Sequence, residues 1–419
     1  MVVRSTWVVL RNNGAFYLAT LLLTVVLAQF AQFLWPTEEF FKGQPAPVFI
    51  NFAGFGVALL FWWIYRPRDS WPPLFAALLA AWGVLWAVVV GLSVLHDDLF
   101  NLTAFLVLPI LAMIWLKKPG MPATFIAGDV FAFGLVVIAL VTQVLIVVGV
   151  REIPYQGWNR LVSQTQAMEF AYRYFGAVLG DWPGPMARWS GPFGNVNYAG
   201  PIGTFLLVYG LLRPWKQRIV FMFAGGVIVL ASDSRTSVLS SAVGVATLVA
   251  VAPQLGSVRT PNWLRIFAPV AVVMVMVGYI VVLDPTLNQR TPVWEVFAAA
   301  WKTSPVVGVG GSGLQELING GTLEWWANHG HSILFDPLAR YGLFGVVAVT
   351  AMMIASGVIA TQAARAGLAA SAVIFTTCLA DGLSEDLVDW RYLGLQAVPL
   401  LLAGLLGAAW LTQARREKT

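Results

Sequence analysis

Residues 73–95 read PLFAALLAAWGVLWAVVVGLSVL and contain no charged side chain. A helix that crosses the hydrocarbon core of a bilayer needs about 20 apolar residues, so this stretch is long enough to span a membrane. It is not exceptional in this chain of 419 residues, of which 58% are hydrophobic and only 11% are charged. Soluble proteins carry about 25% charged residues, and disordered chains are poorer in apolar ones. The composition therefore excludes both classes and predicts a polytopic membrane protein.

Apolar runs bounded by charges, Pro or Gly recur along the whole chain and predict an all-α membrane protein with about twelve transmembrane helices. We treat residues 1–419 as one polytopic membrane domain. The seventh, eighth and eleventh runs are short, so tilted, broken or re-entrant helices are expected there. The twelve runs are 14–35, 48–65, 73–95, 99–116, 124–149, 196–212, 219–231, 238–252, 266–283, 337–360, 367–380 and 392–412.

The charged residues predict the orientation of these helices, because short cytoplasmic loops are enriched in Lys and Arg. With the N-terminus in the cytoplasm, 15 of the 25 basic residues fall in short cytoplasmic segments, and 17 of the 20 acidic residues fall outside. One missed or extra span in the middle would scramble this division, so both termini are expected to be cytoplasmic. The net charge of +5 then reflects topology and does not indicate a nucleic-acid partner.

Two of the predicted external loops are long, namely residues 150–195 and 284–336. Both are rich in aromatic residues, and 158–179 could form a helix on the membrane surface. Long loops on a compact domain are usually functional, whereas the cytoplasmic connections here are short. We therefore expect the chemistry on the outer side, with 284–336 as the catalytic loop.

The tract SDSRTS at 232–237 is the polar exception within an otherwise apolar region. An Arg near membrane depth is costly and is functional by default. Ser232, Asp233 and Ser234 are suitable N-cap residues for the helix that follows, which places Arg235 in its first turn. Backbone N–H groups at a helix start and a guanidinium together suit an anion. The alternatives are an ion pair with Asp233 and snorkelling to the outer surface.

The tract NQRTPVW at 288–294 repeats this arrangement. Thr291 is expected to be the N-cap, and Pro292 fits the first helical position, so Arg290 stands just before a helix start on the outer side. Taken alone, Arg290 is better explained as an interfacial Arg that binds lipid headgroups. Together with Arg235 on the same face of the membrane, it would suit a diphosphate.

The segment WWANHGHSILFDPLARYGLFG at 325–345 contains the candidate base. Imidazole titrates near neutral pH, so His331 is a natural general base for a sugar hydroxyl. His329 lies two residues away, and a His-x-His metal site is an alternative that would need carboxylates such as Glu324 or Asp336. We favour the interpretation in which these histidines bind no metal ion. Asp336 and Arg340 are four residues apart and are expected to pair on a helix.

The tract SPVVGVGGSG at 304–313 resembles a phosphate-binding loop only superficially. No Lys-Ser or Lys-Thr follows the glycines, so a tight irregular loop is expected. Gly308 and Gly310 would allow the backbone conformation of such a loop. In the acidic tract DGLSEDLVDWR at 381–391, a solvated loop is the favoured interpretation. The single cysteine, Cys378, excludes a disulfide framework.

A further candidate tract, RWSGPFGNVNYAG at 188–200, precedes the sixth run on the outer face. Arg188, Asn195 and Asn197 are candidate contacts for a donor or an acceptor, as are His329 and Ser234. Helix capping is the simpler explanation for the two Asn residues.

Four of these motifs, in this order, resemble the O-antigen ligase and O-antigen polymerase superfamily of bacterial membrane proteins. Each motif alone is weak, but their order and predicted face of the membrane match the family, and the resemblance covers roughly 186–345. The motifs are RWSGPFGNVNYAG, similar to Gly-x-x-x-Asn-x-Asn; SDSRTS, similar to Ser-Arg-Thr; RTPVW with SPVVGVGGSG, similar to Arg-x-x-x-Trp and Pro-x-x-Gly-x-Gly; and HSILFDPLARYGLFG, similar to His-Asn-x-x-Leu ending in Gly-Leu-x-Gly.

The resemblance implies an inverting, metal-independent glycosyltransferase of the bacterial cytoplasmic membrane that needs no cofactor. Its donor would be a glycan on undecaprenyl diphosphate, and its acceptor a hydroxyl of lipid A core or of another lipid-linked glycan. Arg235 and Arg290 would bind the diphosphate, and His331 matches the family's critical histidine. Ser332 departs from the family by replacing the usual Asn.

Several functions remain open at this stage. The resemblance implies a ligase or a polymerase without distinguishing them. A transporter or flippase for lipid-linked glycans would also use intramembrane Arg residues, although it predicts ionisable groups at both ends of a central path. A structural scaffold in an envelope complex is a weaker alternative, because it leaves Arg235 unexplained.

Overall fold

A computed structural model gives the architecture of the chain. It describes residues 15–34, 45–64, 73–96, 102–117, 119–147, 191–193, 196–232, 234–251, 254–255, 258–259, 290–322, 330–383, 395 and 397–416. For several residues within the helices, Arg235 among them, only the backbone is described.

Helices occupy eleven of the twelve predicted runs, and the remaining run, 266–283, lies outside the described residues. These helices are α2 (Ala15–Leu34), α3 (Pro45–Ile64), α4 (Pro73–Leu95), α5 (Leu102–Lys117), α6 (Met121–Val147), α8 (Val196–Leu211), α9 (Trp215–Ser232), α10 (Arg235–Val251), α14 (Phe335–Arg365), α15 (Ala369–Gly382) and α16 (Ala397–Arg416). The other elements are η2 (Gly191–Phe193), α12 (Arg290–Thr303), α13 (Gly310–Asn319) and a hairpin of two-residue strands, β1 (Gln254–Leu255) and β2 (Val258–Arg259).

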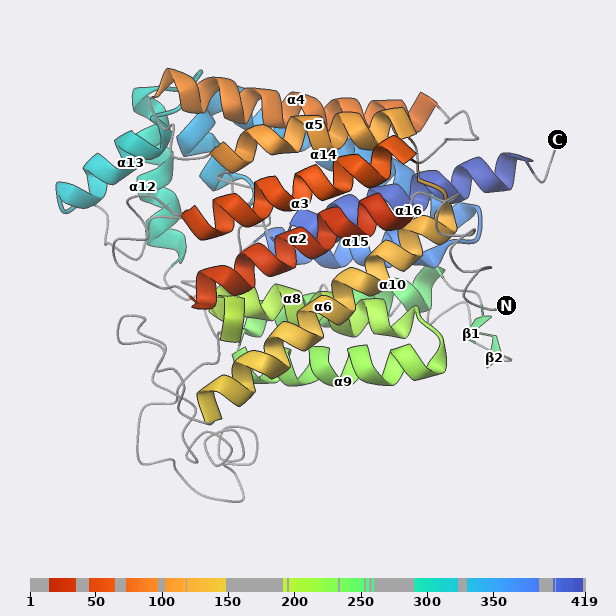
Figure 1. Ribbon diagram of the computed structural model, residues 1–419. Coiled ribbons are helices and arrows are strands. Elements are labelled where there is room, and N and C mark those ends of the chain that lie inside the picture. The colour runs from red at the N-terminus through yellow and green to blue at the C-terminus, as the bar shows by residue number, and fades with distance from the viewer. Residues whose placement is uncertain are drawn as a thin grey trace.

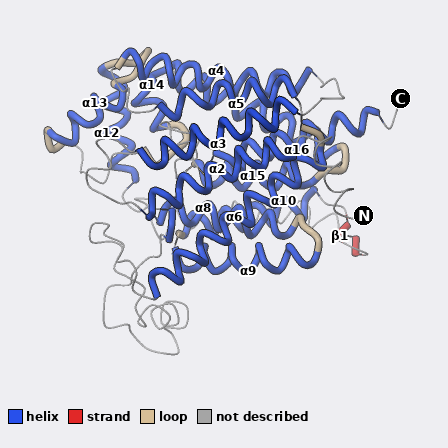
Figure 2. Tube along the Cα trace, in the orientation of Figure 1, coloured by secondary structure: helices blue, strands red, loops and turns tan. Residues whose placement is uncertain are grey.

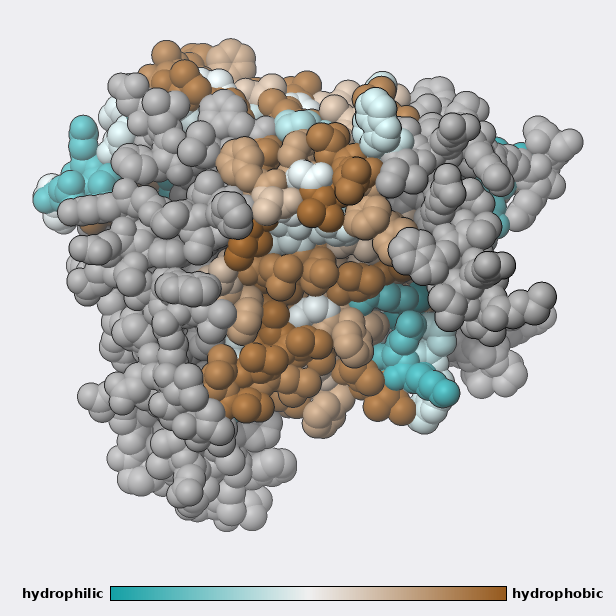
Figure 3. Space-filling model, viewed as in Figure 1, coloured by the Kyte–Doolittle hydropathy of each residue, from teal (hydrophilic) through white to brown (hydrophobic). Residues whose placement is uncertain are grey.

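The prediction of a helical membrane protein is confirmed at this level. Within the described residues, five helices are long and apolar enough to cross a bilayer, and shorter apolar helices accompany them. Figure 3 shows apolar side chains across the middle of one face, with hydrophilic residues gathered toward its two ends. Such a band is what a hydrocarbon layer requires. The number of twelve spans and the side of each terminus stay predictions.

The long helices lie roughly along one direction, while α12 and α13 cross one end of the bundle (Figures 1 and 2). At this end, His96, just after α4, contacts the start of α13, because Ser312 Oγ donates a hydrogen bond to the His96 carbonyl over 3.2 Å. The start of α14 meets the end of α15 through the Ile333 N–H, which donates to the Gly382 carbonyl over 2.8 Å. We call this end of the bundle the α13 end.

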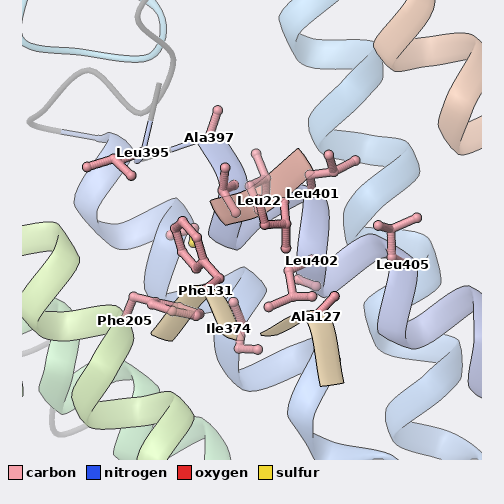
Figure 4. Packing of buried hydrophobic residues seen from close by; sticks show 14 of the residues in the cluster. Leu22, Ala127, Phe131, Phe205, Ile374, Leu395, Ala397, Leu401, Leu402 and Leu405 are labelled. Atoms are coloured by element: carbon pink, nitrogen blue, oxygen red, sulfur yellow. The ribbon is translucent and has the colours of Figure 1, made fainter. Parts of the chain in front are cut away.

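The core of the bundle is built around α16 (Figure 4). Leu401, Leu402 and Leu405 of this helix are almost completely buried, and they lie among side chains from α2, α6, α8 and α15. A helix that is apolar on all sides is expected in the interior of a large or membrane-embedded protein. The central position of α16 therefore follows from its composition.

A polar cluster lies where α6 begins and α8 ends. Arg213 forms an ion pair with Asp129, and the Tyr209 hydroxyl donates to the same carboxylate over 2.9 Å. The Arg213 guanidinium also lies 4.7 Å from the centre of the Phe125 ring. Ionisable groups between membrane helices need such partners. The division of charges predicted that Asp129 and Arg213 lie on the same side of the membrane, and their ion pair is consistent with that prediction.

Candidate functional site

The candidate base lies in a strained turn at the α13 end. His331 has φ = 44°, and it is the only residue other than glycine with a positive φ in the part of the chain that the structure describes. Left-handed backbone is uncommon for a residue with a side chain, and such strain collects at functional sites. Just after it, the Ser332 hydroxyl accepts a hydrogen bond from the Leu334 N–H over 3.3 Å. The turn thus leads directly into α14.

The Asp336 carboxylate, in the first turn of α14, fixes this turn through a hydrogen bond. Its Oδ1 accepts the Gly330 N–H over 2.9 Å, and its Oδ2 accepts Arg340 Nε over 2.9 Å. The predicted pairing of Asp336 and Arg340 is therefore confirmed. Asp336 is completely buried, and both its oxygens already accept hydrogen bonds. This carboxylate therefore stabilises the conformation of the turn. Within the described residues, no group of three or more His, Cys, Asp or Glu side chains gathers as metal ligands.

Helix α12 contacts the same turn from the other side. Trp294 Nε1 donates a hydrogen bond to the Gly330 carbonyl over 2.7 Å, and the Trp294 ring stacks on Phe335 with 5.0 Å between centroids and 10° between planes. Residues four apart lie on one face of a helix, so the half-buried Arg290 lies one turn from Trp294 on this face. The structure thus brings Arg290 and His331 to the same end.

The start of α12 differs slightly from the prediction. The helix already includes Arg290, so Thr291 lies within the first turn and the assignment of Thr291 as N-cap was wrong. Pro292 is tolerated at this position because the first four N–H groups of a helix have no intrahelical partner.

The glycine-rich loop between α12 and α13 packs against a break in α14. Gly342 has φ = 61° and ψ = −148°, which interrupts the helix. The N–H of Leu343, which follows it, donates to the Pro305 carbonyl over 2.9 Å. A Cβ on Gly308 would lie 2.3 Å from the carbonyl carbon of Arg340, so the two backbones touch. The tight irregular loop is confirmed for residues 304–309, whereas residues 310–313 form the first turn of α13.

The tenth apolar run, predicted as one helix over 337–360, is therefore two pieces that meet at Gly342. Only residues 343–365 continue as a regular helix, and the short piece before the break belongs to the site. The break has a physical reason: the loop carbonyls accept the N–H groups that the interrupted helix leaves without partners.

Replacing Gly342 with Ala should destabilise the protein by about 2–4 kcal/mol. The added Cβ would lie 2.5 Å from the Val306 carbonyl carbon, and the backbone at Gly342 lies in a region that is essentially restricted to glycine. Thermal unfolding in detergent measures the effect. Gly91→Ala in α4 is the control, since its Cβ would meet no atom within 4 Å. Equal midpoints for the two variants would contradict this account of the break.

Of the three N-cap candidates, Ser234 takes this position at the start of α10. Its hydroxyl oxygen accepts the Ser237 N–H over 3.3 Å, which is the N-cap bond, and Arg235 is the first helical residue. Thr204 of α8 donates to the Ser237 carbonyl over 3.0 Å, and Ser241 donates to the Thr204 hydroxyl over 3.2 Å. A seam of hydroxyl groups therefore joins α8 and α10.

Helix α15 brings the start of α10 and the His331 turn to the same end of the bundle. Thr376 of α15 donates to Thr247 of α10 over 2.9 Å, and the two helices are antiparallel, since a Cβ on Gly244 would meet Thr377. The end of α15 consequently lies near the start of α10, and it is this end that Ile333 contacts.

Asp381 was missed at the sequence level, where it was assigned to a solvated loop. It is only 2% exposed, and it lines a narrow pocket between α8, α15 and α16 together with Pro201, Thr377 and Cys378. The apolar face of α15 continues to Asp381, because residues 374, 377, 378 and 381 follow helical spacing. This spacing is the sequence signal that could have located it.

The remaining candidates are mostly beyond the described residues. Arg188, Asn195 and His329 lie outside them, as does the loop 150–195 apart from the buried turn η2. Asn197 lies in the first turn of α8. The described part of the loop 284–336 contains two short helices, α12 and α13, of which only the start of α12 was located from the sequence.

No protein-family model matches the chain, and no curated protein matches it.

Proposed function

We propose that the protein transfers a glycan from undecaprenyl diphosphate to a hydroxyl acceptor at the outer face of the bacterial cytoplasmic membrane. The observation that carries the proposal is the hydrogen bond from Trp294 to the Gly330 carbonyl. It ties the helix that begins with Arg290 to the turn that contains His331. A cation and a base at one end of a membrane bundle suit a reaction in which a diphosphate leaves and a hydroxyl attacks.

His331 acts as the general base in this proposal. It takes the proton of the acceptor hydroxyl, whose oxygen then attacks the anomeric carbon of the donor sugar. The bond between that carbon and the diphosphate oxygen breaks, and a single displacement inverts the anomeric configuration. The diphosphate leaves with the electron pair of the broken bond and remains attached to the lipid.

Arg290 and Arg235 stabilise the leaving diphosphate. Cations placed where negative charge develops lower the barrier, and guanidinium groups bind phosphate oxygens through paired hydrogen bonds. Arg235 is the first residue of α10, where backbone N–H groups also favour an anion. In this proposal no metal ion is required, because the two Arg residues carry out the charge neutralisation.

The orientation follows from the charge distribution. Twelve spans with both termini in the cytoplasm place the α13 end outside, and no nucleotide sugar is available there. The donor must therefore be carried on a lipid. The acceptor is a sugar hydroxyl, either on lipid A core, which makes the protein a ligase, or on a second lipid-linked glycan, which makes it a polymerase.

Incubation of the purified protein with a defined lipid-linked repeat unit in the presence of a metal chelator tests the proposal. A ladder of lengthening products identifies a polymerase, and a product that forms only after lipid A core is added identifies a ligase. The absence of any glycosyl product with either acceptor would contradict the proposed activity.

A further inference from the structure

We propose that Trp294 and Asp336 are positioning residues that hold the backbone of His331 in its catalytic conformation. The inference rests on the proposed function and adds residues to which the motif resemblance assigns no role. Neither residue is proposed to touch the substrate. Their role is to fix the peptide group that precedes His331.

The need for such residues follows from the conformation of His331. With φ = 44°, this residue occupies the left-handed region, which is disfavoured for side chains with a Cβ. A strained conformation persists only where the surrounding contacts determine it. If the turn relaxed, the imidazole would move away from the position in which it meets the acceptor hydroxyl.

Both polar groups of Gly330 are held by side chains from outside the turn. The Gly330 carbonyl belongs to the peptide that precedes His331, and Trp294 Nε1 donates to it over 2.7 Å. The Gly330 N–H donates to Asp336 Oδ1 over 2.9 Å, and Arg340 orients that carboxylate through its other oxygen. These bonds fix the two peptide planes that flank Gly330. The second of these planes, between Gly330 and His331, is one of the two planes whose relative orientation sets the φ and ψ of His331.

The residues after His331 are also held. The Ile333 N–H donates to the Gly382 carbonyl at the end of α15 over 2.8 Å, and Phe335 stacks on the ring of Trp294. Trp294 thus contacts the turn both before and after His331, through its N–H and through its ring. Trp294→Phe removes the N–H donor and keeps an aromatic ring for the stack, so this variant isolates the hydrogen bond.

Trp301 provides a matched control on the same helix. Its Nε1 donates to the Pro305 carbonyl over 2.9 Å, which is also a bond from an indole to a backbone carbonyl, but it does not involve the His331 turn. Trp301→Phe therefore makes the same chemical change away from the base.

The kinetic test compares these variants in the transfer assay. Trp294→Phe should lower kcat by about 10- to 100-fold, as misplacement of a catalytic group does, with the KM for the donor within about two-fold of wild type and an unchanged unfolding midpoint. Asp336→Asn should show the same split between kcat and KM, and Trp301→Phe should behave as wild type. A kcat of Trp294→Phe within two-fold of wild type, or a parallel fall in kcat and unfolding midpoint, would overturn the positioning role.

A second readout does not depend on activity. The chain has three histidines, so a sample with isotope-labelled histidine gives few ring signals, and the spectrum of His331→Gln identifies that of His331. Trp294→Phe should broaden or split the His331 signal, whereas Trp301→Phe should leave it unchanged. An unaltered His331 signal in Trp294→Phe would refute the inference.

The two proposals can fail separately. If His331→Ala is inactive while Trp294→Phe keeps full activity and an unaltered His331 signal, only the positioning role is wrong. If His331→Ala keeps full activity, the assignment of the base is wrong, whatever Trp294 does to the turn.

Discussion

Replacing His331 with Ala lowers the rate of glycan transfer by about 10²- to 10⁴-fold, the usual contribution of a general base. The fold should survive, because Trp294, Ser332 and Asp336 make hydrogen bonds that hold the turn. Ala keeps the Cβ that makes φ = 44° unfavourable, so the variant adds no backbone strain of this kind. The measurement is the transfer rate of the purified variant at saturating donor, with the unfolding midpoint recorded in parallel.

His329→Ala is the control for this experiment. It removes the neighbouring imidazole of the His-x-His pair. We expect this variant to lose far less activity, because only His331 has the spacing of the critical histidine in the superfamily that the motifs resemble. Full activity of His331→Ala in a folded sample would remove His331 from the mechanism. Equal losses in both variants would revive the alternative in which the two histidines bind a metal ion together.

Replacing Arg290 or Arg235 with Ala weakens binding of the lipid diphosphate donor by about 10- to 100-fold for each residue. A hydrogen bond to a charged group contributes about 1.5–3 kcal/mol, and every 1.4 kcal/mol corresponds to a tenfold change in the dissociation constant. Titration of the donor into the detergent-solubilised protein, followed by a change in intrinsic tryptophan fluorescence or by calorimetry, measures the effect without requiring turnover.

Lys302→Ala is the control for charge. Lys302 is an exposed residue in the last turn of α12, so this variant removes one positive charge from the same helix as Arg290 but away from the His331 turn. We expect donor affinity within about two-fold of wild type. Unchanged affinity in both Arg290→Ala and Arg235→Ala would eliminate the diphosphate site.

The sequence was sufficient to locate eleven apolar helices of the described residues, because each apolar run is bounded by charges, Pro or Gly. Run 73–95 coincides with α4, and the N-cap at Ser234 and the ion pair of Asp336 and Arg340 were also predictable. These features depend on local spacing: an N-cap needs a hydroxyl before a helix, and a pair on a helix needs residues four apart.

Contacts between distant segments could not be predicted from spacing. The break at Gly342 depends on carbonyls of the loop at 304–309, and the bond from Trp294 to Gly330 joins residues that are 36 positions apart. Asp381 was predicted to lie in a solvent-exposed loop, because the tract that begins with it is acidic. In the structure the end of α15 packs beside α8, and Asp381 is buried there. Such tertiary contacts can bury a residue even when its neighbours in the sequence are typical of an exposed loop.

The most direct test of the central claim separates transfer from transport. The protein is reconstituted in liposomes in which the lipid-linked donor is confined to the leaflet that faces the α13 end, with the acceptor supplied on the same side. The account predicts that glycosyl product forms there without movement of the donor across the bilayer, and that His331→Ala forms it about 10²- to 10⁴-fold more slowly. Movement of the donor to the other leaflet without any glycosyl product would contradict the account and identify a flippase.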